Sequence, residues 1–175
     1  INCYILGDFF LHNSDCSELT PHDEQQYCLH LIDEAATLAL GAKIATTLHA
    51  GLIIFLKGDL GAGKTTLTRG ILRAMGYQGK VKSPTYNLVE IYNFSRLYLY
   101  HFDFYRFNDY SEWEAAGFRD YFNSETICLV EWPEKGGDLL PTADLTIKLQ
   151  FTDQGRLAEI QANTILGKQC LTLLA

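Results

Sequence analysis

Residues 58–65 read GDLGAGKT and match the pattern G-x-x-x-x-G-K-[ST] at every fixed position. The preceding residues 52–56, LIIFL, are continuously apolar, which is typical of a strand buried on both faces of a sheet. Residues 65–75 then have the composition of a helix, and Gly76 ends it. A buried strand, a glycine-rich turn and a helix in this order are the context that a phosphate-binding loop requires. The sequence therefore predicts a P-loop within an α/β fold.

Each residue type in this loop has a chemical reason. Glycines let successive backbone N–H groups turn around a phosphate without a Cβ in the way, and the helix N-terminus adds a partial positive charge. We expect Lys64 to reach the β- and γ-phosphates, Thr65 to ligate magnesium and Thr66 to contact the α-phosphate. The alternative is a glycine-rich turn without a ligand. We expect ATP and Mg²⁺ to bind here, with the nucleotide contacted by Asp59, Leu60, Gly61, Ala62, Gly63, Lys64, Thr65 and Thr66.

Hydrophobic periodicity outlines the rest of the fold. Apolar residues recur at helical spacing over residues 33–48, and the tail from residue 164 also has a helical pattern. Residues 111–116 are expected to begin a short helix with a capping box. Strands are expected at residues 86–92, 97–103, 126–130, 145–151 and 157–161, with hairpins joining the first two and the last two. The fold class is therefore α/β and P-loop NTPase-like, with a mostly parallel central sheet flanked by helices and extended by antiparallel hairpins.

The chain divides into two parts by pattern. Residues 31–175 form the predicted P-loop domain, a length that suits one domain. Residues 1–30 show no sustained period and are expected to be a loosely ordered leader of unknown role.

Two acidic residues are candidates to complete the site. Glu131 directly follows the apolar residues 127–130, as the acid of a Walker-B strand does, although any strand can end in a glutamate. Asp103 lies in residues 101–106, HFDFYR, where alternate side chains point to opposite faces of a strand. The polar side chains appear only as this strand ends, so Asp103 either serves the site or forms a structural pair with His101.

A third candidate segment follows the predicted P-loop helix. Ser83 and Thr85 flank Pro84 between that helix and the next strand, which is the position of a nucleotide-sensing switch segment. Both hydroxyls could face the γ-phosphate. An extended turn around the proline is the equally good alternative.

Composition limits the possible functions. Asp and Glu number 21 against 14 Lys and Arg, so the net charge is −7, and no Lys/Arg run is present. We therefore expect any nucleic acid to be held by a partner, because phosphate contacts dominate such binding. The five scattered cysteines form no C-x-x-C pair and indicate reduced thiols in the cytoplasm. No apolar run is long enough to span a bilayer, so no membrane association is expected.

Several linked motifs resemble the TsaE (YjeE) family, the bacterial ATPase subunit of the machinery that makes N6-threonylcarbamoyladenosine on tRNA. Their order and spacing agree with the family, and the resemblance runs from about residue 33 to the C-terminus. Phe104 stands where the family often has leucine, an apolar exchange that affects no catalytic group. The matching stretches are residues 58–66, 82–86, 88–90, 101–106, 117–122 and 128–133.

The resemblance implies roles for individual residues. Lys64, Asp103 and Glu131 would be the catalytic residues, and Thr65 and Glu131 would form the magnesium site. Ser83 and Thr85 would belong to the family's switch segment. The nucleotide-binding set would also include Trp132, which matches a tryptophan important to the family's activity, and Arg156, which together with residues 33–35 would lie near the base.

The family also implies partners. These would be TsaD-like and TsaB-like proteins, with tRNA contacted only through them. ATP binding and hydrolysis would reset that complex during modification of adenosine 37 in tRNAs that read ANN codons. The alternatives are a small-molecule P-loop kinase, against which no arginine-rich lid follows the loop, and a nucleotide-gated interaction module without catalysis. A GTPase is disfavoured because the guanine-selecting N-K-x-D sequence is absent.

Overall fold

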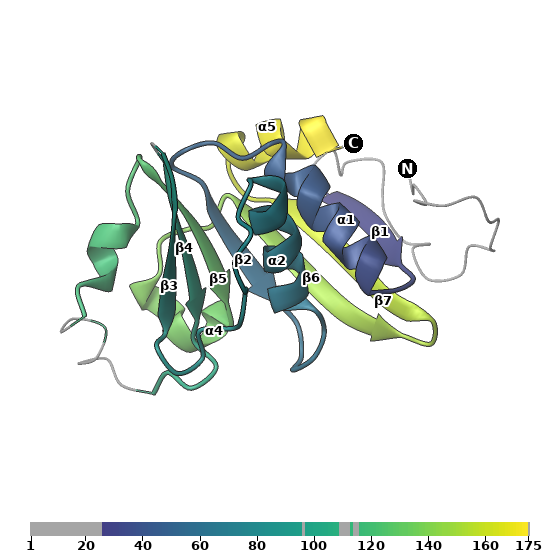
Figure 1. The fold of residues 1–175 in the computed structure, drawn as a ribbon, viewed down its shortest axis with the longest axis horizontal. Coiled ribbons are helices and arrows are strands. Elements are labelled where there is room, and N and C mark those ends of the chain that lie inside the picture. The colour runs from purple at the N-terminus through teal and green to yellow at the C-terminus, as the bar shows by residue number, and fades with distance from the viewer. Residues whose placement is uncertain (1–25, 96, 109–112, 114–115, 175) are drawn as a thin grey trace.

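The computed structural model describes residues 26–174 apart from 96, 109–112, 114 and 115. Within these residues, seven strands form one sheet in the order β1-β7-β6-β2-β5-β4-β3 (Figure 1). The central strands β6, β2, β5 and β4 are parallel, whereas β1, β7 and β3 add antiparallel pairs at the two sides. The predicted fold class is confirmed. The strands are β1 (Gln26–Leu31), β2 (Ile53–Lys57), β3 (Val89–Phe94), β4 (Leu97–Asp103), β5 (Thr126–Glu131), β6 (Leu145–Thr152) and β7 (Gly155–Ala162).

Helices α1 (Glu34–Ala45) and α2 (Lys64–Ala74) lie side by side on one face of the sheet (Figure 1). α1 begins where the side chain of Asp33 accepts a hydrogen bond from the Ala36 N–H at 2.7 Å. The C-terminal helix α5 (Ile165–Leu174) packs against the same apolar core. Short helical turns complete the fold: η1 (Phe118–Tyr121), α4 (Pro133–Gly136) and η2 (Gly137–Leu139). None of the helices in the described part of the chain is long and apolar enough to cross a membrane.

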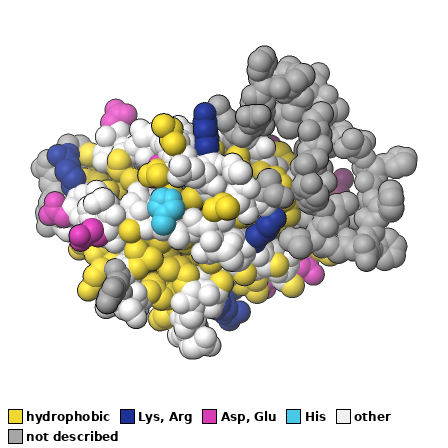
Figure 2. All heavy atoms as spheres, turned by 90° about the horizontal axis from the view of Figure 1, so that it is seen from above, with side chains coloured by type: hydrophobic (Ala, Val, Ile, Leu, Met, Phe, Trp, Pro, Cys, Tyr) yellow, Lys and Arg dark blue, Asp and Glu magenta, His cyan; other side chains and the backbone are white. Residues whose placement is uncertain are grey.

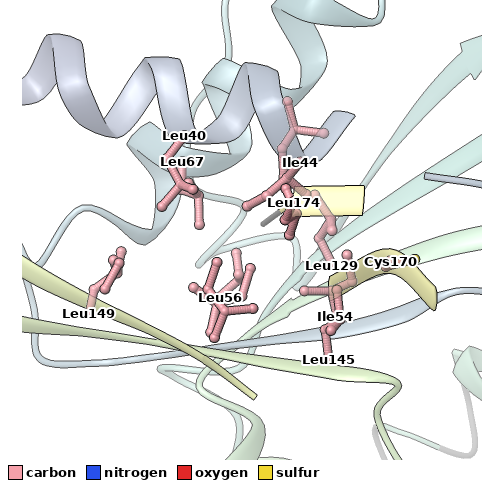
Figure 3. Packing of buried hydrophobic residues seen from close by; sticks show 14 of the residues in the cluster. Leu40, Ile44, Ile54, Leu56, Leu67, Leu129, Leu145, Leu149, Cys170 and Leu174 are labelled. Atoms are coloured by element: carbon pink, nitrogen blue, oxygen red, sulfur yellow. The ribbon is translucent and has the colours of Figure 1, made fainter. Parts of the chain in front are cut away.

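The sheet has a different apolar layer on each face. On the helix face, aliphatic side chains such as Leu40, Leu56 and Leu67 pack between the helices and the central strands (Figure 3). On the opposite face, Phe102 and Phe104 stack within an aromatic cluster that contains other rings from the chain between β4 and β5. Because residues 102 and 104 face this cluster, residues 101 and 103 must face the helix side of the sheet. The alternation predicted for this strand is thus confirmed.

The edges of the sheet differ from the sequence-based boundaries. β3 begins at Val89 rather than at residue 86, because residues 85–87 form a turn in which Tyr86 is 80% exposed. β1 begins at Gln26, inside the stretch assigned to the leader, and buries Tyr27, Leu29 and Leu31. Cys28 is buried as well, so burial along this edge strand does not alternate strictly and its period is weak.

Some predictions fall where the structure gives no description. Residues 1–25 lie outside the described residues, so the loosely ordered leader stays a prediction. The same holds for most of the helix expected at residues 111–116.

Candidate functional site

The loop between β2 and α2 has the backbone that its glycines were expected to allow. Gly58, Gly61 and Gly63 all have positive φ angles, of 137°, 80° and 110°. A Cβ on Gly58 would also lie 2.3 Å from the carbonyl oxygen of Leu149. Residues with a side chain adopt this region only under strain, so the loop requires glycine here. Gly61, Gly63 and the N-terminus of α2 line one pocket, and a helix N-terminus in such a position suits an anion.

Lys64, the first residue of α2, points back across this loop. Its Nζ donates hydrogen bonds to the carbonyl oxygens of Gly58 (2.6 Å) and Asp59 (2.9 Å), and it lies 4.1 Å from the centre of the Trp132 ring. Burial lowers the pKa of Lys64 from its ordinary value, and the charges of Glu131 and Asp103 oppose that change. An anion in the pocket would supply a counter-charge to this buried ammonium.

Glu131 ends β5 beside the start of α2 and is almost fully buried. Its Oε1 accepts a hydrogen bond from the Thr65 hydroxyl at 2.8 Å, and His101 Nε2 lies 2.8 Å from the same oxygen. A hydroxyl and a carboxylate side by side are hard oxygen donors of the kind that Mg²⁺ prefers. Mg²⁺ commonly takes only one or two protein ligands and completes its shell with phosphate oxygens and water. Thr65 and Glu131 therefore fit a magnesium site.

Asp103 ends β4 directly opposite Glu131 in the parallel register of β4 and β5. Its Oδ1 accepts from the Tyr105 N–H at 2.9 Å, and its Oδ2 accepts from the Ser83 hydroxyl. The carboxylate is thus held from the strand end and from the segment expected to act as a switch. The alternative prediction, a structural pair between His101 and Asp103, is wrong, because the ring of His101 forms its hydrogen bond with Glu131.

These groups surround a pocket of about 430 Å³. A second pocket, of about 280 Å³, adjoins it and includes Arg156 together with Asp33 and Glu34 from the start of α1. The Arg156 guanidinium lies 4.1 Å above the Phe151 ring. Asp59 lines neither pocket and contributes its carbonyl oxygen to Lys64. Of the sequence-predicted residues, the first pocket is lined by Leu60, Gly61, Gly63, Lys64, Thr65, Thr66, Ser83, Thr85, Asp103, Glu131 and Trp132, and the second by Gly61, Ala62, Gly63, Thr66 and Arg156.

Comparisons with known proteins identify the family of this chain. A family model described as "Threonylcarbamoyl adenosine biosynthesis protein TsaE" matches residues 31–158. The chain belongs to the TsaE family. A TsaE of Haemophilus influenzae is 48% identical over 148 residues, which cover 82% of this chain and 94% of that protein. A TsaE of Bacillus subtilis is 38% identical over 119 residues, covering 68% of this chain and 74% of that protein.

The fold agrees with a solved structure as well. The crystal structure of Bacillus subtilis YdiB matches with a TM-score of 0.74 and 29% sequence identity. The match covers 86% of this chain and 94% of YdiB. The family and the fold class expected from the sequence are therefore both shown.

The site also contains side chains that were not among the predicted site residues. Tyr105 and Arg106 line the larger pocket, and His101 contacts Glu131. The signal available for all three was the polar end of residues 101–106, which predicted a site at this strand end. It could not assign partners, because the partners are distant in the sequence.

Proposed function

We propose that this chain binds ATP with Mg²⁺ and hydrolyses it, and that it does so in the biosynthesis of threonylcarbamoyladenosine in tRNA, the process for which its relatives are named. The observation that carries the proposal is the hydrogen bond between Thr65 and Glu131 at the mouth of the glycine loop. It joins the P-loop hydroxyl to the acid of a neighbouring strand, which is the pairing that a nucleotide-bound magnesium ion uses.

Each group has a task in this reaction. The loop amides and Lys64 would hold the phosphate tail and balance its charge. Thr65 and Glu131 would hold the metal ion, which when bound neutralises charge on the transferred phosphoryl group. Asp103, fixed by Tyr105 and Ser83, would orient the attacking water from its position opposite Glu131.

The base of the nucleotide would occupy the smaller pocket. Arg156 and the start of α1 lie there, and the pocket shares Gly61, Gly63 and Thr66 with the larger one. A nucleotide could therefore extend from one pocket into the other along the glycine loop.

The proposed partners are TsaD-like and TsaB-like proteins in the cytoplasm, with tRNA contacted only through them. Supporting this, the chain has a net charge of −7. Figure 2 also shows that Lys and Arg side chains stand apart from one another on the face seen from above, without a basic patch. Electrostatic attraction to a phosphate backbone requires such a patch. Co-purification with a TsaD–TsaB pair in ATP and in ADP tests this part, and failure to associate in either nucleotide would contradict it.

Calorimetric titration with Mg²⁺ and ATP tests the site itself. Lys64→Ala should weaken ATP binding by about tenfold or more, because charge-assisted hydrogen bonds to phosphate are lost. Lys57→Ala is the matched control, since Lys57 lies one residue before the loop but is exposed. Glu131→Gln should keep magnesium-free ATP binding, lose most of the magnesium-dependent gain in affinity, and lower phosphate release by about 100-fold or more.

The outcomes separate the alternatives. No heat on adding ATP to the folded wild-type chain would refute the proposal. Transfer of labelled γ-phosphate to a metabolite would indicate a small-molecule kinase, since an ATPase releases only inorganic phosphate. Tight binding without any hydrolysis, also with the partners present, would indicate a nucleotide-gated interaction module.

A further inference from the structure

We propose that His101 is a positioning residue that holds the carboxylate of Glu131 against the P-loop; this inference rests on the proposed function. His101 lies in β4, is 0% exposed, and has Nε2 at 2.8 Å from Glu131 Oε1. The structure places it next to the catalytic groups without a place in the pocket lining. Its effect on the reaction must therefore pass through Glu131.

The direction of the hydrogen bond follows from chemistry. A carboxylate oxygen only accepts, so Nε2 carries the hydrogen and donates to Glu131. The same oxygen accepts from the Thr65 hydroxyl at 2.8 Å. Glu131 Oε1 is thus fixed from two sides, by a buried ring on β4 and by the first turn of α2.

The second ring nitrogen of His101 makes no hydrogen bond within the described part of the chain. This nitrogen, Nδ1, is buried. In the register of the sheet, His101 stands between Glu90 on β3 and Leu129 on β5. A buried polar ring is costly unless it makes hydrogen bonds, and an apolar side chain would fill this position without that cost. The one bond that the ring makes therefore explains why a histidine is buried here.

The two donors on Oε1 differ in what else they can bind. The Thr65 hydroxyl lines the pocket and is a candidate ligand for magnesium, whereas His101 is fully buried and lies outside the pocket lining. When Thr65 turns toward a ligand, His101 remains the donor that keeps Glu131 in place. Loss of His101 should therefore matter more in the presence of magnesium nucleotide than in its absence.

Two variants separate this role from packing. His101→Leu removes the donor and keeps a buried side chain of similar size, and His101→Gln keeps an N–H donor near the place of Nε2. We expect His101→Leu to bind ATP without magnesium within about threefold of wild type. Its magnesium-dependent gain in affinity and its kcat should each fall about tenfold, since one charge-assisted hydrogen bond is lost. KM for ATP in the presence of magnesium should rise as that affinity falls. His101→Gln should recover both to within about threefold.

Nitrogen-15 NMR of the His101 ring in the nucleotide-free chain tests the hydrogen bond to Glu131 without measuring ATP hydrolysis. The Nε2 proton of His101 should exchange slowly and change its shift in Glu131→Gln. A signal that Glu131→Gln leaves unchanged would overturn the inference, even if His101→Leu does not fold. So would wild-type magnesium dependence in a folded His101→Leu chain, or a His101→Gln chain as impaired as His101→Leu. A wild-type chain that binds no ATP but keeps the coupled NMR signal would instead count against the proposed function alone.

Discussion

Helices α1 and α2 approach each other through two glycines, Gly41 and Gly70. A Cβ on Gly41 would lie 2.5 Å from the carbonyl oxygen of Leu67 and 2.9 Å from the Cα of Gly70. A Cβ on Gly70 would lie 2.5 Å from the carbonyl oxygen of Leu38. Real Cβ atoms do not approach backbone atoms this closely, so Gly41→Ala should force the two helices apart.

The magnitude follows from two opposing effects. In a free helix, glycine to alanine gains about 1 kcal/mol because alanine orders at a lower entropic cost. At Gly41, the facing backbone has to move by roughly 0.9 Å to reach the 3.4 Å of ordinary contact, and overpacking costs about 1–3 kcal/mol. We expect a net loss of up to about 2 kcal/mol in the free energy of unfolding. For a chain of this size the melting temperature should fall by up to about 8 °C.

The same displacement should reach the nucleotide site. α2 begins at Lys64, so moving α2 moves the amides that frame the pocket. We expect ATP affinity to fall about three- to tenfold in Gly41→Ala, since tenfold corresponds to about 1.4 kcal/mol. Calorimetry with magnesium and ATP measures this change.

Thermal and urea unfolding of matched variants provide the assay. Ala39→Gly is the control, because Ala39 is exposed in the same helix and loses the methyl group that Gly41→Ala gains. It should cost about 1 kcal/mol. Gly41→Ala with Gly70→Ala should destabilise less than the two single changes added together, because one separation of the helices relieves both contacts. A rise in melting temperature in Gly41→Ala, as large as the fall in Ala39→Gly, would refute the close approach of the helices.

Three further predictions concern other parts of the chain. Burial raises the pKa of Cys128 from its ordinary 9.0 to about 12, so the folded chain keeps a proton that the unfolded chain releases. The free energy of unfolding should therefore fall as pH rises above about 9, by at most about 1.4 kcal/mol per pH unit. Urea unfolding measures this decline, and an equally steep decline in Cys128→Ala would contradict the prediction. The Trp132 ring lies 4.1 Å from Lys64 Nζ, so tryptophan fluorescence should change when a nucleotide binds to Lys64. Trp132→Phe should abolish this change, and a change that persists would assign it to Trp113. The Asp144 carboxylate accepts hydrogen bonds from the Ile53 N–H at 2.9 Å and from the Thr164 hydroxyl just before α5. Asp144→Ala should therefore lower the free energy of unfolding in urea by about 1–3 kcal/mol, more than Asp144→Asn does. Equal losses in the two variants would show that the acceptor oxygen is unimportant.

Local patterns were enough to find the elements that carry the site. The P-loop could be predicted from residues 58–65 because the glycines, the lysine and the threonine of this motif act through local backbone geometry and local side chains. The strand ending at Asp103 was placed to the residue, since its apolar residues give way to His101 and Asp103 on one face only at its end. The prediction that this loop binds phosphate depends on the same local residue types.

The family resemblance placed Thr65 and Glu131 at one site, but the residue patterns by themselves could not decide which acid contacts which partner, and the tertiary structure did. Thr65 and Glu131 are 66 positions apart in the sequence, and their contact depends on β5 lying between β2 and β4. The register that sets Asp103 opposite Glu131, and that gives His101 to Glu131 rather than to Asp103, is likewise a property of the assembled sheet. Strand order and register follow from the packing of both faces of the sheet at once, and a period read along one segment contains no information about its neighbours.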